Sequence, residues 1–243
     1  MTTSWRRARG SDGGVLNPLL LAALLRSCGG GTLPPLLERA QVALIAQESG
    51  GDSWAIHDDN SGVAYYPRTY AQAVATARTL VAHDRAIGGR GVDVGLTQID
   101  DENFRRYNLS SATALDPCAS IRASSAILAK TYADETRYVA LETTDRAVIS
   151  AVALDRTLEV YNSGRPEGDY QYTRDVLTQM SSRYVAIATG ALAGEQPAQL
   201  SAAWRFVRLG GGDRATTVTR NSQRFAGDDA DDVFSTPNGG HNG

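Results

Sequence analysis

Apolar residues recur every three or four positions along most of this chain, which is the periodicity of helices that bury one face. The first such run covers residues 15–25, and a glycine run at residues 29–31 separates it from the next. The second run starts at Pro34, a residue that favours the first turn of a helix, and ends at Glu48. The N-terminal part of the chain therefore predicts two consecutive helices.

Further helices are predicted downstream. Residues 70–83 carry one apolar stripe, and Asp116 followed by Pro117 supplies a cap and a first-position proline for the next helix. Residues 147–161 are almost continuously apolar, which indicates a central helix, and residues 170–187 form the last amphipathic segment. In that last helix we expect the buried stripe to be Val176, Met180, Tyr184 and Ile187.

Only residues 63–66 favour a strand, so the expected fold class is mainly α, a helical bundle with a small β hairpin or tongue. Residues 1–14 are rich in Arg, Ser and Gly and read as a flexible leader. The character of the chain changes beyond about residue 190, and residues 210–243 are polar and glycine-rich, so residues 190–243 are predicted to be a low-complexity, disordered tail. The folded domain is predicted to span residues 15–189.

Composition excludes several function classes. The formal net charge is −3 and no basic cluster is present, which argues against a nucleic-acid surface. No apolar stretch is long enough for a transmembrane helix. The glycine-rich residues 88–95 lack the glycine offsets and the preceding strand of a nucleotide-binding loop, so no cofactor is expected.

The cysteines and histidines do not form a metal motif. The 2 cysteines, Cys28 and Cys118, lie far apart, and the 3 histidines are scattered, so we expect no metal site. Spacing alone leaves two states open for the cysteines, a disulfide in an exported protein or two buried thiols.

The N-terminus has features of an export signal. Arg6, Arg7 and Arg9 precede the apolar residues 15–25, but Arg26 follows them where a small-residue cleavage site is needed. We prefer a first helix of the folded domain over a cryptic signal peptide, and the export route stays open.

Glu48 is the candidate for acid chemistry. It ends an apolar helix and precedes Ser49-Gly50-Gly51. Aliphatic neighbours and the carbonyl-rich end of a helix both disfavour the ionised carboxyl and raise its pKa, as a general acid requires. The alternative is a solvated glutamate in a last helical turn.

Four strings in order link the chain to a known family. They are Glu48-Ser49-Gly50-Gly51, Asp93-Val94-Gly95-Leu96-Thr97-Gln98-Ile99, Asp116-Pro117-Cys118 and Tyr161-Asn162-Ser163-Gly164. Across roughly residues 19–187 the sequence resembles the lytic transglycosylases of type IV secretion and conjugation systems, which have a soluble-lytic-transglycosylase domain related to goose-type lysozyme.

The resemblance implies a lysozyme-like fold and cleavage of the β-1,4 bond between N-acetylmuramic acid and N-acetylglucosamine, leaving a 1,6-anhydro end. It implies that Glu48 is the sole catalytic carboxyl, first acid and then base. Peptidoglycan strands would be the substrate, secretion or conjugation components the partners, and the periplasm or cell envelope the location. Because the substrate's own acetamido group can stabilise charge at the anomeric carbon, one carboxyl can suffice.

Other site residues follow from the same motifs. The amide of Gln98 would bind the sugar's acetamido group, the phenol of Tyr161 would hydrogen-bond the acid, and Asn162 would hold a loop or the substrate. Ser49 would bond Glu48 or sugar, although a serine there often satisfies backbone groups. Asp93 is a second-tier candidate for sugar hydroxyls or a turn.

Two alternatives stay open. A lysozyme-like muramidase would use the same cleft for hydrolysis, and a non-catalytic wall-binding module would grip glycan without cutting it.

Overall fold

Helices make up most of the part of the chain that the computed structural model describes, which is residues 15–28, 33–168 and 170–189. The mainly helical fold class predicted from the sequence is confirmed. The predicted leader, residues 1–14, and the predicted tail, residues 190–243, lie outside the described residues. Within those residues, none of the helices has the length and apolar character needed to cross a bilayer.

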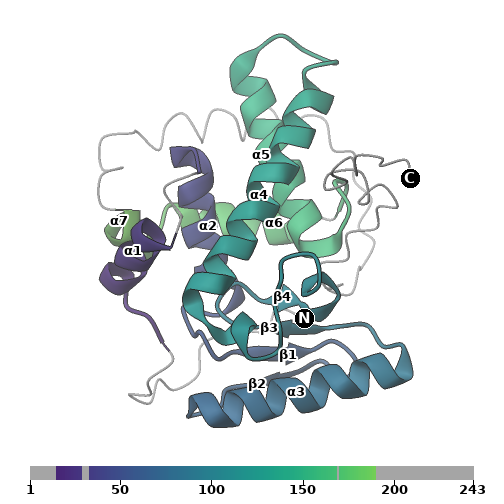
Figure 1. The fold of residues 1–243 in the computed structure, drawn as a ribbon. Helices are drawn as coiled ribbons and strands as arrows, with labels where there is room; N and C mark the ends of the chain where they lie inside the picture. Colours follow the sequence, from purple (N-terminus) through teal and green to yellow (C-terminus); the bar gives the residue numbers. More distant parts are fainter. Residues whose placement is uncertain (1–14, 29–32, 169, 190–243) are drawn as a thin grey trace, which may run out of the picture.

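The elements follow one another in a simple order (Figure 1). The helices are α1 (Pro18–Ser27), α2 (Pro35–Glu48), α3 (Tyr70–Ile87), α4 (Pro117–Val139), α5 (Arg146–Ser163), α6 (Gln171–Met180) and α7 (Arg183–Thr189). The strands are β1 (Ile56–Asp58), β2 (Val63–Tyr65), β3 (Val92–Val94) and β4 (Ile99–Asp100), and two short 3₁₀ turns, η2 (Asp101–Asn103) and η3 (Thr113–Leu115), precede α4.

The strands form one antiparallel sheet in the order β2-β1-β3-β4. The predicted strand at residues 63–66 is confirmed as β2, and it pairs with β1 as a hairpin. β3 and β4 were not predicted, because strands of two or three residues carry too little alternation to be recognised. Helix α3 runs along this sheet at one side of the molecule, and the other helices stand on its far side (Figure 1).

Helix α2 contributes to two groups of buried apolar side chains. Leu37 and Ile45 pack with residues of α1, α6 and α7, whereas Leu44 packs with the sheet, α3 and α5. The second group includes the aromatic ring of Tyr161, which is fully buried. The C-terminal end of α2 is therefore held between the helical part and the sheet.

Local signals in the sequence place several helix ends. Asp116 caps α4 as predicted, its Oδ1 accepting from the Ala119 N–H at 2.8 Å. Helix α3 continues beyond the predicted end at residue 83 to Ile87, where Gly88 stops it in the left-handed conformation (φ 59°). The residues from 84 to 87 are therefore part of α3.

The predicted single helix at residues 170–187 was wrong. Tyr170 has a positive φ of 57°, so the helix starts one residue later, and it ends at Met180. Two serines then interrupt it, and the Ser182 hydroxyl accepts from the Val185 N–H at 3.3 Å at the start of α7. The break turns the side chain of Ile187 outward, and this residue is 37% exposed instead of buried.

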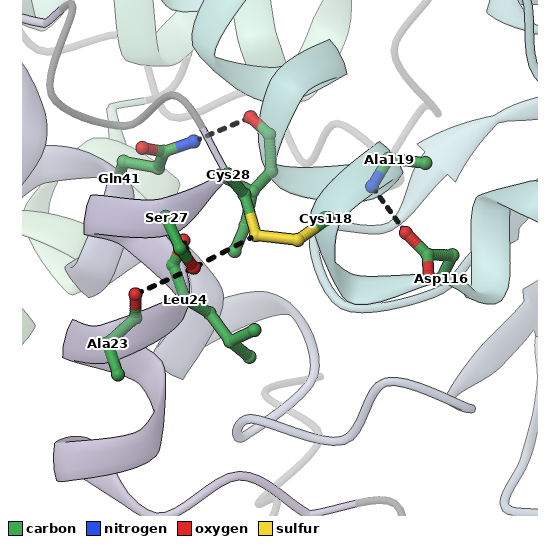
Figure 2. The surroundings of a disulfide bond; sticks show 9 residues. Ala23, Leu24, Ser27, Cys28, Gln41, Asp116, Cys118 and Ala119 are labelled. Carbon is green, nitrogen blue, oxygen red and sulfur yellow. Dashed lines mark hydrogen bonds between the residues drawn. A yellow bond between two sulfur atoms is a disulfide. The ribbon is translucent and has the colours of Figure 1, made fainter.

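A disulfide joins the end of α1 to the start of α4 (Figure 2). Cys28 lies at the C-terminal cap of α1 and Cys118 in the first turn of α4, with Cα atoms 5.0 Å apart. Beside the disulfide, the Gln41 amide of α2 donates to the Ile121 carbonyl of α4 at 3.0 Å. The disulfide and this hydrogen bond together tie α1, α2 and α4 to one another, and Leu21 and Leu25 of α1 are buried.

Candidate active site

Glu48 is the last residue of α2, and its side chain is almost completely buried, with 9% of the residue exposed. The helix stops here because Gly50 and Gly51 both adopt positive φ angles, 64° and 86°, that few other residues tolerate. The chain turns away after Ser49, and the carboxyl group stays at the helix end. The solvated glutamate that the sequence left as an alternative is not what the structure contains.

A tyrosine of α6, 124 positions further along the chain, holds this carboxyl group. The hydroxyl of Tyr172, in the first turn of α6, donates a hydrogen bond to Oε1 of Glu48. The Tyr172 ring is buried, with 6% of the residue exposed. A buried donor aimed at a carboxylate oxygen fixes its orientation and stabilises the ionised form.

Sequence reasoning missed Tyr172. One signal could have found it, because Tyr172 precedes Val176 and Met180 at helical spacing and so extends the buried stripe of α6. A tyrosine at the end of a buried stripe needs a polar partner for its hydroxyl.

Ser49 connects the end of α2 to the second sequence string. Its hydroxyl donates to the Leu96 carbonyl at 2.7 Å, lies 3.2 Å from the Ile45 carbonyl and accepts from the Gly51 N–H at 3.1 Å. The Ser49 hydroxyl thus bonds backbone groups, which is the second of the two roles considered from the sequence. A contact from Ser49 to sugar stays a prediction.

Gln98 adopts a left-handed conformation (φ 48°), which is uncommon for a residue other than glycine and often marks a functional loop. Its amide nitrogen donates to the carbonyls of Ala55, at 3.0 Å, and Gly95, at 2.8 Å. Both N–H groups are thereby used within the protein. Only the side-chain carbonyl oxygen of Gln98 is left for a ligand. In the predicted contact with a sugar, Gln98 would therefore accept a hydrogen bond and not donate one.

Gly95 allows the loop before Gln98 to lie against η3. Its φ is 86°, and a Cβ atom there would lie 2.1 Å from the Ala114 carbonyl oxygen. No larger residue fits without moving the main chain.

Tyr161 also anchors this loop. The phenol donates to the Thr97 carbonyl at 2.8 Å, and the side chain is fully buried near the end of α5. The loop carrying Gln98 is therefore held from one side by Ser49 and from the other by Tyr161. The predicted bond from Tyr161 to the acid stays a prediction.

Asn162 follows Tyr161 and is half-buried in the last turn of α5. Its predicted role in holding a loop or the substrate is untested by these contacts. Gly164 then ends α5 with a φ of 71°.

Two buried acids lie on α5 beside the first turn of α6. Asp155 and Glu159 are 5% and 1% exposed, although the sequence suggested an almost purely apolar helix here. Burial, and then the neighbouring charge of Glu159, raise the pKa of Asp155 to about 7. Glu159 Oε1 accepts from the Thr173 hydroxyl at 2.6 Å, so the residue next to Tyr172 is anchored to α5.

The geometry brings together three of the four sequence strings. Ser49, which follows Glu48, and Tyr161 both donate hydrogen bonds to carbonyls of the short loop that ends at Gln98. Tyr172, which belongs to none of the four strings, donates to Glu48 itself. The remaining string, Asp116-Pro117-Cys118, serves as a helix cap and disulfide instead. One buried carboxyl, held by a phenol at a helix end, is an arrangement suited to proton transfer.

A mainly helical fold with a small antiparallel sheet and a buried glutamate at the end of α2 is consistent with a lysozyme-like domain. The family model described as "Transglycosylase SLT domain" matches residues 35–166, more than half of the chain, and the chain belongs to that family.

Curated relatives carry one name. The chain is 32% identical to protein virB1 of Agrobacterium fabrum over 164 residues, covering 62% of this chain and 61% of the relative. It is 33% identical to protein virB1 of Rhizobium radiobacter over 131 residues, covering 54% and 49%. The type IV secretion system protein virB1 of Brucella abortus is 27% identical over 99 residues, covering 41% and 40%. The chain thus spans about three fifths or less of these relatives' length. No solved structure matches significantly.

Proposed function

We propose that this protein is a peptidoglycan lytic transglycosylase that opens the cell wall locally for a type IV secretion or conjugation apparatus. The observation that carries the proposal is the buried carboxyl of Glu48, which lies inside the segment that matches the transglycosylase family and accepts a hydrogen bond from the Tyr172 hydroxyl on its Oε1. The names of the virB1 relatives supply the secretion context.

The chemistry requires one group that gives and then takes a proton. Glu48 donates its proton to the oxygen of the β-1,4 bond as that bond breaks at the anomeric carbon of N-acetylmuramic acid. The resulting carboxylate removes the proton of the sugar's 6-hydroxyl, and the 6-oxygen attacks the anomeric carbon. The products are a 1,6-anhydro end and a free 4-hydroxyl, and no water is consumed.

Tyr172 suits this cycle. Because its hydroxyl is on Oε1, the transferable proton belongs on Oε2 of Glu48. The same hydrogen bond stabilises the carboxylate that forms after the proton has left. Gln98 would accept a hydrogen bond from the acetamido N–H of a sugar, since its own N–H groups are used. Asn162 would contact the glycan or order the neighbouring loop.

The disulfide supports a location outside the cytoplasm. Disulfides persist in oxidising compartments such as the periplasm, where peptidoglycan is accessible. We infer a periplasmic or cell-envelope location.

The experiment is a digestion of purified sacculi by the full chain, with the released muropeptides identified by mass spectrometry. We expect anhydro ends, and we expect Glu48→Gln to reduce their release by about 10² to 10⁴-fold, the range for loss of a general acid. Glu38→Gln, on the first turn of the same helix, is the matched control and should leave release unchanged.

Two outcomes would select the alternatives. Reducing ends in place of anhydro ends would identify a muramidase. Binding of glycan without any release, equal for wild type and Glu48→Gln, would identify a wall-binding module.

A further inference from the structure

Three side chains that could bind a cation meet on one face of the sheet. His57 of β1 and Asp93 of β3 are direct partners in the antiparallel register, and Asp59 follows β1 by one residue. Each of the three offers one nitrogen or oxygen atom, and these atoms all lie within 4.8 Å of one another. Their neighbours Ile56 and Val94 are buried in the core on the other face, as strand alternation requires.

Asp59 carries an oxygen atom that lacks a partner. Its Oδ1 lies 2.9 Å from Nδ1 of His57, and its side chain is only 5% exposed. Its Oδ2 is buried and has no hydrogen-bond partner within the described part of the chain. Oδ2 belongs to the same carboxylate as Oδ1, the atom that contacts His57. A buried carboxylate oxygen without a partner is costly, and a bound cation would remove that cost.

The main chain fixes Asp59 in this position. Its N–H donates to the Gly91 carbonyl at 3.2 Å, and Nη2 of Arg90 donates to its carbonyl oxygen at 2.5 Å. Asp58, just before it, accepts from the Asn60 N–H at 3.0 Å and stabilises the turn. A cation would therefore meet a preformed set of atoms and would not have to order a loop.

We propose that His57, Asp59 and Asp93 form a binding site for a divalent transition-metal ion of the Zn²⁺ class. One imidazole nitrogen and two carboxylate oxygens match the ligands that Zn²⁺ takes in proteins, whereas Mg²⁺ and Ca²⁺ prefer oxygen alone. Sequence spacing gives no sign of this site, because its members come from two strands and a turn that only the fold brings together. The sequence predicts no metal site, because only ligands that are close together along the chain can be recognised from it.

The site lies next to the candidate active site. Gln98, whose amide donates to the Ala55 carbonyl, ties the loop after β3 to the residues just before β1. A cation bridging His57 and Asp93 would join the same two strands a short distance away. The bound cation would make the sheet beside Gln98 more rigid. Cation binding at these residues does not depend on the transglycosylase reaction.

The test is isothermal titration calorimetry on the full chain after removal of metals with EDTA. ZnCl₂, MgCl₂ and CaCl₂ are titrated in parallel. We expect one Zn²⁺ to bind per chain, more tightly than Mg²⁺ or Ca²⁺. His57→Gln and Asp59→Asn should each weaken Zn²⁺ binding by at least about tenfold. His83→Gln, an exposed histidine on α3, is the control and should bind like wild type.

Circular dichroism checks that each variant folds. If Asp59→Asn does not fold, the half-buried Asp93→Asn is the second variant, with the same expected loss. Absence of saturable Zn²⁺ binding, variants that bind like wild type, or tighter binding of Mg²⁺ or Ca²⁺ would each overturn the proposal.

Discussion

Replacing Tyr172 by phenylalanine removes one hydroxyl group from the candidate active site and leaves the packing of the ring unchanged. The Oε1 atom of Glu48 then loses a donor in a buried place. A hydrogen bond to a charged group contributes about 1.5 to 3 kcal/mol. Because the charge on Glu48 develops as it gives up its proton, we expect most of this loss in the transition state.

The expected effect on kcat/KM follows from that energy. A loss of about 2 kcal/mol corresponds to a rate lower by about 30-fold, since each 1.36 kcal/mol is tenfold. The assay is the initial rate of anhydro-muropeptide release from sacculi at several substrate concentrations. KM should change little, because Tyr172 contacts the acid and not the proposed sugar positions.

Tyr184→Phe is the matched control. Its hydroxyl donates to the Leu16 carbonyl at 3.3 Å, so this variant loses a comparable tyrosine hydroxyl that is bound to a backbone carbonyl. We expect a slightly lower melting temperature and an unchanged kcat/KM. If Tyr172→Phe kept the wild-type rate, or if both variants slowed release equally, the assigned role of Tyr172 would be refuted.

Two further predictions concern stability. The raised pKa of Asp155 means that the folded protein favours its protonated form, so its contribution to stability is full below about pH 4 and is lost as pH rises to about 7. The free energy of unfolding of Asp155→Asn should therefore exceed that of the wild type by a margin that grows between those pH values to about 4 kcal/mol and stays constant above them. If urea unfolding gave the same difference between the two proteins at every pH, this prediction would be contradicted. Replacing Cys28 and Cys118 together by serine should lower the free energy of unfolding by about 4 to 5 kcal/mol, because the bond closes a loop with a sequence separation of 90. Urea unfolding of the double variant, compared with the wild type under oxidising conditions, measures that loss, and an unchanged midpoint would argue against the bond.

The sequence predicts features that depend on neighbouring residues. The stripe predicted on α3 is confirmed only in part, because Ala77 and Val81 are buried whereas Tyr70, its first member, is exposed. The cap at Asp116 and the end of α2 before two glycines are local features, and the structure contains both. The same is true of Glu48, because a helix end can be recognised from a few residues on either side.

Features that depend on distant contacts were missed. Tyr172 lies 124 positions from Glu48, and no local pattern indicates which side chain a tyrosine will meet. Asp155 and Glu159 were absorbed into an apolar run, because their burial is decided by the packing of α6 on α5. The break between α6 and α7 was missed because serines are only weak helix breakers.

The supports of Glu48 come from segments that are remote along the chain. Ser49 reaches Leu96, and Tyr172 comes from a helix near the end of the described residues. A nascent or unfolded polypeptide therefore has no organised proton donor, and cutting ability would arise only once the last of these helices has docked.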